Sequence, residues 1–167
     1  TDVTVSFRVL PKQRLYGGFS GTETSRDDRD PKAYPSILSG DLGVPGDVTD
    51  NSNTVVWLQS RTTFGPIESD TVIDGFVITA GNATGNAPDM PSVGGGLYCD
   101  RYCSPTLQQL VFEDNRAMSG GGALGLLIMG GPVDLHLRDL VFRNNHAQSI
   151  GAALVLTAQR DTGEEAI

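Results

Sequence analysis

The chain has 167 residues, a formal net charge of −8 and a pI near 4.5. Its twelve Lys and Arg residues are scattered, so it lacks the clustered positive charge that nucleic-acid binding requires. No apolar run approaches the roughly eighteen residues of a membrane-spanning helix, and 21 glycines and nine prolines interrupt the chain too often for long amphipathic helices. The composition therefore predicts an all-β protein without nucleic-acid partners and without a membrane span in this sequence.

The two ends of the chain suggest how it is organised. Residues 1–9 alternate between apolar and polar side chains, which is typical of a half-buried strand. There is no initiator methionine before this strand, and residues 158–167 form a polar tail directly after the last strand-like segment. Because stacked strands need covered ends, we expect a single domain over residues 1–167 that is a segment of a larger protein or has partners on its ends.

Two long polar loops, residues 20–34 and 41–53, precede the more regular part of the sequence. The first mixes acidic and basic residues, which is typical of a solvated, self-paired surface. The second holds three carboxylates and two side-chain amides, namely those of Asp41, Asp47, Asp50, Asn51 and Asn53. Calcium prefers six to eight such oxygens, so this loop is a candidate calcium site, although its spacing is not that of an EF-hand. The same residue types also cap tight turns through their own backbone, and this alternative stays open.

The C-terminal half is repetitive. Residues 107–126 and 137–156 are identical at eleven of twenty aligned positions. A fainter copy begins at Ile73, thirty-four residues before Leu107, and an insertion within residues 84–93 interrupts it before Gly94–Gly96 restores the alignment with Gly120–Gly122. A strand-like sequence that repeats at a fixed short period predicts stacked structural units, with residues 84–93 as a protruding loop.

The aligned copies also predict which side chains face inward. We expect an apolar inward ladder of Val77, Val111 and Val141. At the position after the first aligned apolar residue stand Asp74, Gln108 and Arg138, which we expect to face outward.

The two cysteines, Cys99 and Cys103, are separated by three residues. A disulfide would suit an oxidising compartment, whereas free thiols suit a reducing one. A metal site is a third alternative, although there is no second cysteine pair and no histidine nearby in the sequence.

Several motifs carry a resemblance to a known family. They are Leu-Tyr-Gly-Gly-Phe-Ser-Gly (15–21), Pro-Ser-Ile-Leu-Ser-Gly-Asp-Leu-Gly (35–43), Ile-Asp-Gly-Phe-Val-Ile-Thr (73–79) and Gly-Gly-Gly-Leu-Tyr (94–98). From about residue 10 to 157 the chain resembles parallel β-helix proteins of the pectin-lyase-like superfamily. More narrowly, it is similar to bacterial surface or secreted proteins with polymorphic-outer-membrane-protein-like repeats.

The resemblance implies a right-handed parallel β-helix solenoid of about five coils, with long corner loops in its N-terminal half. It also implies a secreted or cell-surface location. The asparagines at positions 115 and 145 resemble the stacked asparagine turns of such folds, a ladder of two rungs because Gly81 takes the corresponding place upstream.

The fold alone does not name an activity. Polysaccharide lyases on this fold combine a calcium-binding aspartate cluster with a basic residue, whereas the outer ladder predicted here does not concentrate carboxylates, so we assign no catalytic residue. The sequence favours a non-catalytic scaffold or adhesion module, with calcium as the candidate cofactor and glycans or other proteins as candidate partners. Two alternatives remain: a structural subunit of a fibre or larger complex, and a part of a polysaccharide lyase or glycoside hydrolase.

Overall fold

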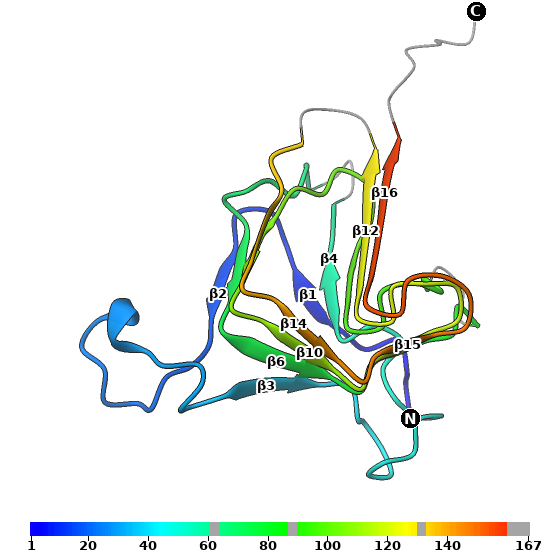
Figure 1. Cartoon of the computed structure of the whole chain (residues 1–167), viewed down its shortest axis with the longest axis horizontal. Coiled ribbons are helices and arrows are strands. Elements are labelled where there is room, and N and C mark those ends of the chain that lie inside the picture. Colours follow the sequence, from blue (N-terminus) through cyan, green and yellow to red (C-terminus); the bar gives the residue numbers. More distant parts are fainter. Residues whose placement is uncertain (61–63, 87–89, 130–132, 160–167) are drawn as a thin grey trace, which may run out of the picture.

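The computed structural model describes residues 1–60, 64–86, 90–129 and 133–159 of the chain (Figure 1). Within these ranges the structure is all-β, apart from one short 3-10 helix, η1 (Arg26–Asp28). The paired strands run parallel to one another, an arrangement compatible with the predicted parallel β-helix. No helix in the described part of the chain is long and apolar enough to cross a membrane.

The strands form four parallel sheets, which enclose the interior in Figure 1. Sheet I contains β2 (Arg14–Tyr16), β5 (Val72–Asp74), β9 (Thr106–Gln108) and β13 (His136–Arg138). Sheet II contains β3 (Ser36–Ser39), β6 (Phe76–Thr79), β10 (Val111–Glu113) and β14 (Val141–Arg143). Sheet III contains β7 (Asn82–Ala83), β11 (Arg116–Ala117) and β15 (His146–Ala147). Sheet IV contains β1 (Phe7–Val9), β4 (Val56–Leu58), β8 (Leu97–Cys99), β12 (Leu124–Met129) and β16 (Leu154–Gln159).

From β5 to β16 the chain passes three times through sheets I, II, III and IV in that order. Leu107 pairs with Leu137, which confirms the thirty-residue alignment, and Ile73 pairs with Leu107, which confirms the fainter copy. The glycine alignment was wrong by one residue, because Leu97 pairs with Leu124 and this register places Gly94 opposite Gly121. Both glycines have a positive φ, 69° and 56°, so a shared left-handed turn sets the register.

The corners between sheets I and II are made by single left-handed residues. Gly75, Gln109 and Asp139 follow the strands of sheet I and have φ values of 84°, 50° and 50°. A single residue in this region turns the chain sharply without a long loop. β6 begins directly after its corner residue, and β10 and β14 begin two residues after theirs, whereas a long loop joins β2 to β3.

The interior is lined by one or two apolar side chains from each strand. The inward residues with no exposed surface include Ile73, Leu107, Ile78, Phe112, Ala83, Leu58, Leu97, Cys99, Leu124 and Leu126. Phe112 and Phe142 stack with ring centroids 5.3 Å apart, so equivalent side chains of neighbouring repeats touch. These ladders form one continuous core along the stack.

The prediction that a ladder of valines faces the interior was wrong. Val77, Val111 and Val141 pair as expected, but they lie on the outer face of sheet II, where Val141 is 49% exposed. The run Leu110-Val111-Phe112 is apolar at all three positions, so period-2 alternation alone does not fix which side chains point inward. The larger phenylalanine fills the interior, and the valine faces out.

Parts of the predicted loops differ from their expected bounds. Residues 20–34 and 41–50 protrude (Figure 1), but residues 51–53 are buried, and Ser52 accepts a backbone hydrogen bond from Asn82 (2.8 Å). The insertion after β7 is described except for residues 87–89. Residues 158 and 159 belong to β16 rather than to the predicted tail, whose remaining residues lie outside the described part of the chain.

Asn115 and Asn145 form the expected two-rung ladder. The Asn115 side chain is fully buried and donates to Asn145 Oδ1 (3.1 Å) and to the carbonyl of Ile78 (2.9 Å). Its own Oδ1 accepts the Gly81 N–H (3.0 Å). One amide thus satisfies backbone groups of two neighbouring repeats at a corner.

We expect Asn115→Ala to lower the free energy of unfolding by about 2–3 kcal/mol, because it leaves buried backbone groups unpaired. Urea denaturation followed by far-ultraviolet circular dichroism measures the loss. Arg116→Ala, at an exposed position of the same turn, is the matched control and should change stability by no more than about 0.5 kcal/mol. Equal losses for the two variants would contradict a structural role for the asparagine ladder.

Candidate functional site

The outer face of sheet II carries an apolar stripe along the stack. Ile37, Val77, Val111 and Val141 occupy one register position in four neighbouring strands. Ile37 is 61% exposed and Val141 is 49% exposed, whereas Val77 and Val111 are half-buried. A contiguous stripe of exposed and half-buried β-branched side chains is more informative than scattered apolar residues, because such patches often mark binding surfaces.

The loop of residues 20–34 is built on capped turns. Glu23 accepts backbone N–H groups of Ser20 (2.6 Å), Gly21 (2.9 Å) and Thr22 (3.0 Å). These hydrogen bonds, above all that from Ser20, lower the pKa of Glu23 to about 2. Ser25 caps η1, and Asp30 accepts the N–H groups of Lys32 and Ala33. The charged residues of this loop therefore organise its backbone.

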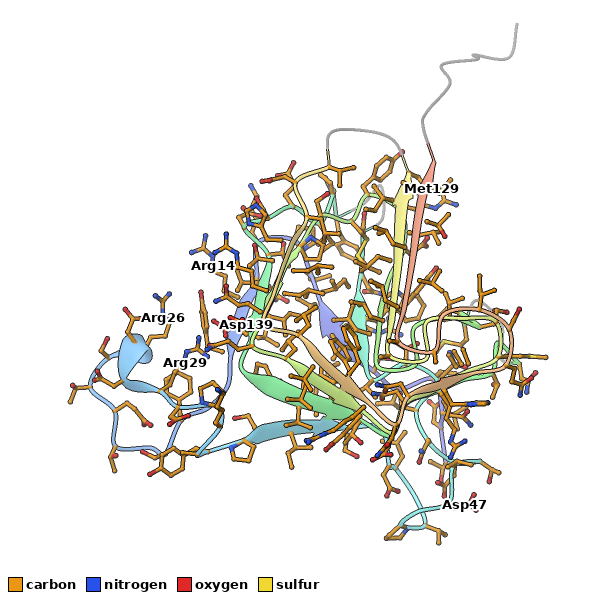
Figure 2. All side chains as sticks on the ribbon, viewed as in Figure 1. Arg14, Arg26, Arg29, Asp47, Met129 and Asp139 are labelled. Atoms are coloured by element: carbon orange, nitrogen blue, oxygen red, sulfur yellow. A yellow bond between two sulfur atoms is a disulfide. The ribbon has the colours of Figure 1, made fainter. Side chains whose placement is uncertain are left out.

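A buried ion pair fixes this loop against sheets I and II. Arg29 Nη2 pairs with Asp74 Oδ2, and the two side chains are 10% and 1% exposed. Arg29 also donates to the carbonyl of Gly17 (3.1 Å) and to Gln109 (3.2 Å), while Gln108 donates to Asp74 (2.6 Å). Asp74 points away from the core side chain Ile73, as expected, but the loop covers it. In Figure 2, Arg29 lies between η1 and the sheets, on the same side as Asp139.

The close approach of the loop requires glycine at one corner. Gly75 has φ of 84°, and a Cβ there would lie 2.5 Å from Arg29 Nη1 and 2.9 Å from Pro31 Cγ. Any larger residue would be strained by its backbone conformation and would displace the loop.

The loop and sheet II together line a groove of about 630 Å³. Its wall includes Arg29, Pro31 and Lys32, and its floor includes Val77, Val111 and Val141. This volume lies within the range of about 300–1,000 Å³ that is common for ligand sites. The groove combines a mostly aliphatic floor with a wall that carries charges of both signs, from Arg29, Asp30 and Lys32, and that the Arg29–Asp74 pair holds in place.

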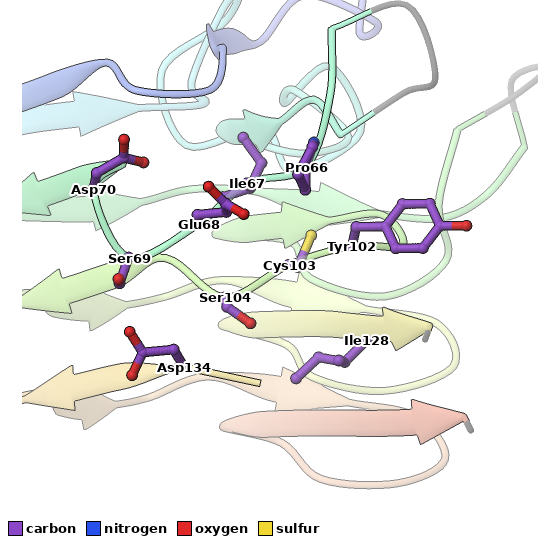
Figure 3. Close-up of a pocket in the computed structure, with 10 residues that line it drawn as sticks. All are labelled: Pro66, Ile67, Glu68, Ser69, Asp70, Tyr102, Cys103, Ser104, Ile128 and Asp134. Atoms are coloured by element: carbon purple, nitrogen blue, oxygen red, sulfur yellow. The ribbon is translucent and has the colours of Figure 1, made fainter. Parts of the chain in front are cut away.

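A second cleft, of about 520 Å³, lies beside sheet I at its corner with sheet IV (Figure 3). Its acidic residues are Glu68, Asp70 and Asp134, and Ser69, Ser104 and Tyr102 also line it. A hydrogen bond from Ser69 and the neighbouring His136 lower the pKa of Asp134. Among the described residues, no three His, Cys, Asp or Glu side chains gather in a way that could hold a metal ion.

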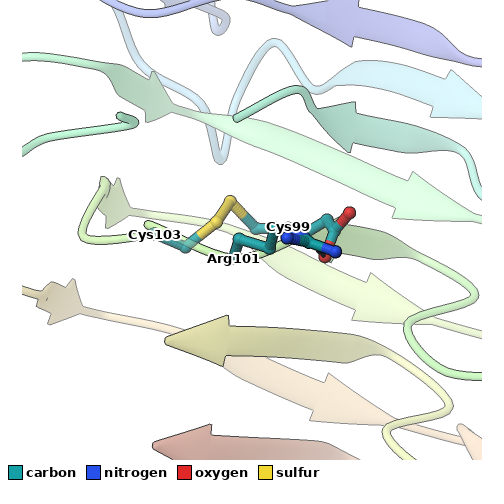
Figure 4. Close-up of a disulfide and its surroundings, with 4 residues drawn as sticks. Cys99, Arg101 and Cys103 are labelled. Atoms are coloured by element: carbon teal, nitrogen blue, oxygen red, sulfur yellow. Dashed lines mark ion pairs between the residues drawn. A yellow bond between two sulfur atoms is a disulfide. The ribbon is translucent and has the colours of Figure 1, made fainter. Parts of the chain in front are cut away.

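Cys99 and Cys103 form a disulfide (Figure 4). Both residues are buried, Cys99 in the core ladder of sheet IV and Cys103 opposite Ile67. The sequence left a disulfide, free thiols and a metal site as alternatives, and the structure contains the disulfide. It holds Tyr102 and Ser104, which line the acidic cleft, close to β8.

Reduction of this disulfide is expected to lower the free energy of unfolding by about 2 kcal/mol, because the bond closes a short loop and constrains the unfolded chain. Urea midpoints with and without dithiothreitol measure the shift. The double variant Cys99→Ala/Cys103→Ala is the control, since its midpoint should not respond to the reductant. An unchanged midpoint for the wild-type chain would contradict a stabilising role.

The candidate calcium residues serve mainly as turn caps. Asp41 accepts the Gly46 N–H (3.1 Å), Asp50 accepts the Val44 N–H (2.8 Å), and Asp47 accepts both the N–H and the hydroxyl of Thr49. The hydrogen bonds from Thr49 lower the pKa of Asp47, which lies at the tip of the loop in Figure 2.

The two asparagines of this set are buried. Asn53 Oδ1 accepts the Thr84 N–H (3.1 Å), and its Nδ2 donates to the Pro91 carbonyl (2.8 Å). The Oδ1 atoms of Asp50 and Asn51 are buried without a hydrogen-bond partner in the protein. Turn capping thus accounts for most of the set, and calcium binding stays a prediction.

The residues of the groove wall and of the acidic cleft were missed by the sequence analysis. Asp70, Ser104 and Asp134 lie two residues before the paired strands of sheet I, so the repeat alignment already places them at one register position. The residue type differs between the repeats at this position, so sequence identity between the repeats does not single it out. The wall residues carry no comparable signal, because the contact that places Arg29 against Asp74 spans forty-five positions of sequence.

No known protein family, curated protein or solved structure matches this chain. The function is therefore inferred from the groove, the cleft and the arrangement of the sheets.

Proposed function

We propose that this chain is a right-handed parallel β-helix that acts outside the cell, secreted or at the cell surface, as a non-catalytic adhesion scaffold. The three passages through sheets I to IV in one order support the helical architecture. The disulfide supports an oxidising compartment. The observation that carries the adhesion function is the groove over sheet II, because its walls are fixed and its floor is aliphatic.

The polar groups around the groove favour binding over chemistry. Asp74 is paired with Arg29, Asp30 caps a turn, and Glu113, in the next row of sheet II, is paired with Arg143 (2.6 Å). A nucleophile or general base must be free to approach its substrate, and these three carboxylates have structural partners, whereas Asp139, which also lines the groove, is exposed. The exposed Lys32 can bind an anionic group while the valines contact an apolar surface of the same ligand. Acidic glycans offer both features.

An oligosaccharide array probed with the whole chain tests this function. We expect at least one acidic oligosaccharide to bind, and Val111→Glu to weaken that binding tenfold or more because it places a charge on the groove floor. Arg116→Glu, on the outer face of sheet III, is the matched control and should bind as the wild type does. Absence of binding, or equal binding by both variants, would contradict the groove as an adhesion site.

A hydrolase or lyase is the second candidate, and the acidic cleft is the observation that favours it. Glu68, Asp70 and Asp134 line one cavity, and glycosidases require a pair of carboxylates. Incubation of the chain with the same oligosaccharides, followed by mass spectrometry of the products, separates the two functions. Cleavage that survives Val111→Glu but is lost in Asp134→Asn would assign catalysis to the cleft and overturn the non-catalytic proposal.

A further inference from the structure

The acidic cleft beside sheet I leaves most of its carboxylates without structural partners. Glu68, Asp70 and Asp134 line it, and none of the described residues that line it is Lys, Arg or His. The ion pairs within the described part of the chain include neither Glu68 nor Asp70. Asp70 Oδ1 is buried without a hydrogen-bond partner in the protein. Asp74 and Glu113, on sheets I and II, are instead paired with arginines.

Two basic residues border the cleft. Arg14 donates to the backbone carbonyl of Asp70 (3.1 Å) rather than to its carboxylate. A hydrogen bond from Ser69, together with the charge of His136, lowers the pKa of Asp134. Asp134 is therefore ionised at neutral pH, and three carboxylates face one permanent positive charge. The cleft keeps a negative charge that attracts a cation.

A buried hydroxyl without a partner also lines this cleft. Ser104 is only 7% exposed, and its Oγ makes no hydrogen bond with any other residue that the structure describes. In Figure 3 this hydroxyl points towards the side of the cleft where Ile128 lies. The backbone position is fixed, because the Ser104 N–H donates to the Ile67 carbonyl (2.7 Å). Buried hydroxyl groups normally have a hydrogen-bond partner, so this one indicates an occupant of the cleft.

The carboxylates are spread along the cleft rather than gathered at one point. Asp70 precedes β5 and Asp134 precedes β13, and β9 lies between these strands in sheet I. Because neighbouring strands are about 4.8 Å apart, these two residues are separated by roughly 10 Å. A calcium ion binds its oxygens at about 2.3–2.6 Å and cannot reach both. An occupant that pairs with both ends must carry two positive groups with a spacer between them.

The surroundings of these charges suit an apolar spacer. Ile128, which is 4% exposed, and Pro66 also line the cleft. An alkyl chain in contact with these side chains is removed from water, which favours binding. The cleft volume of about 520 Å³ accommodates a small organic molecule.

We propose that the acidic cleft binds a linear polyamine, that is, an alkyl chain with ammonium groups at or near both ends. One ammonium group pairs with Glu68 and Asp70, and the other pairs with Asp134. Ser104 Oγ accepts an N–H group of the same ligand, and Ile128 contacts its alkyl chain. Hydrogen bonds from an ammonium group to a carboxylate are charge-assisted and therefore strong. A lysine side chain has only one such group and reaches only one end of the cleft.

Isothermal titration calorimetry of the whole chain with spermidine, at physiological ionic strength, tests this proposal. We expect saturable binding of one spermidine per chain. Asp134→Asn should weaken it by about tenfold or more, and Ser104→Ala by about threefold, because each removes a hydrogen-bond partner of the ligand. Asp114→Asn is the matched control and should bind as the wild type does. It removes the same charge at an exposed position with φ of 55°, and Asn144 has the same conformation in the next repeat.

The other outcomes would overturn the proposal. Absence of saturable binding excludes a polyamine site, and equal weakening by Asp114→Asn and Asp134→Asn would show only a general attraction to an acidic chain. The amide of N-acetyl-lysine, which has one ammonium group, should bind about tenfold more weakly than spermidine, and equal affinity would contradict pairing at both ends. Displacement of spermidine by an equimolar amount of calcium chloride would assign the cleft to a metal ion. Val111→Glu should bind spermidine as the wild type does, which separates this site from the groove.

Discussion

Phe112→Asp is expected to unfold the protein. Phe112 has no exposed surface, lies within the core and stacks on Phe142. Truncation of a buried phenylalanine to alanine costs about 3–5 kcal/mol, and burial of an unpaired carboxylate adds a further desolvation penalty. Because small domains are stable by only about 5–15 kcal/mol, the native state should not persist. Loss of the far-ultraviolet strand signal and of a cooperative thermal transition measures the effect.

Val141→Asp is the matched control for this prediction. Val141 pairs with Val111, the residue next to Phe112, but its side chain lies on the outer face and is 49% exposed. A charge at this position remains hydrated, so we expect a change in unfolding free energy of no more than about 1 kcal/mol. If Val141→Asp unfolds the chain while Phe112→Asp does not, the valines line the interior and the facing described above is wrong.

The contrast between these two residues shows how far the sequence can predict the fold. The eleven identities between the last two repeats identify the register, because residues that are stacked on each other meet the same surroundings. Facing depends instead on the corners. The left-handed residue Gln109 turns the chain between Leu107 and Leu110, so both leucines point inward although they are three positions apart. An alternation of inward and outward side chains that is extended from one strand into the next therefore predicts the wrong side of the sheet.

The candidate site was less predictable than the register, for a physical reason. The sequence predicted that the Asp74 side chain points outward, because a repeat alignment shows which positions of a strand share one side of the sheet. Its burial depends on Arg29, which reaches it from a loop forty-five residues earlier. Loops outside the repeat have no second copy in this sequence with which to compare them. The groove, whose wall is this loop, was therefore visible only in three dimensions.

Arg29→Ala is expected to lower the free energy of unfolding by about 3–5 kcal/mol, because it leaves the carboxylate of Asp74 buried without its cation. Oδ1 of Asp74 is already buried without a hydrogen-bond partner in the protein, so Gln108 would be the main remaining donor to this carboxylate. Urea denaturation of the variant measures the loss. The double variant Arg29→Met/Asp74→Leu should recover most of it, since it removes both charges and keeps similar volumes.

Arg26→Ala supplies the control on the same loop. The Arg26 side chain is 53% exposed and its partner Asp27 is 77% exposed, so this ion pair is screened by water and its loss should leave the free energy of unfolding nearly unchanged. A similar cost for the two arginines would mean that Asp74 is hydrated and that the loop is not held at Arg29. A large difference would place the anchor of the groove wall at the Arg29–Asp74 pair. In that case, Arg29→Ala should also weaken ligand binding, because a wall that is no longer fixed must be ordered when the ligand binds.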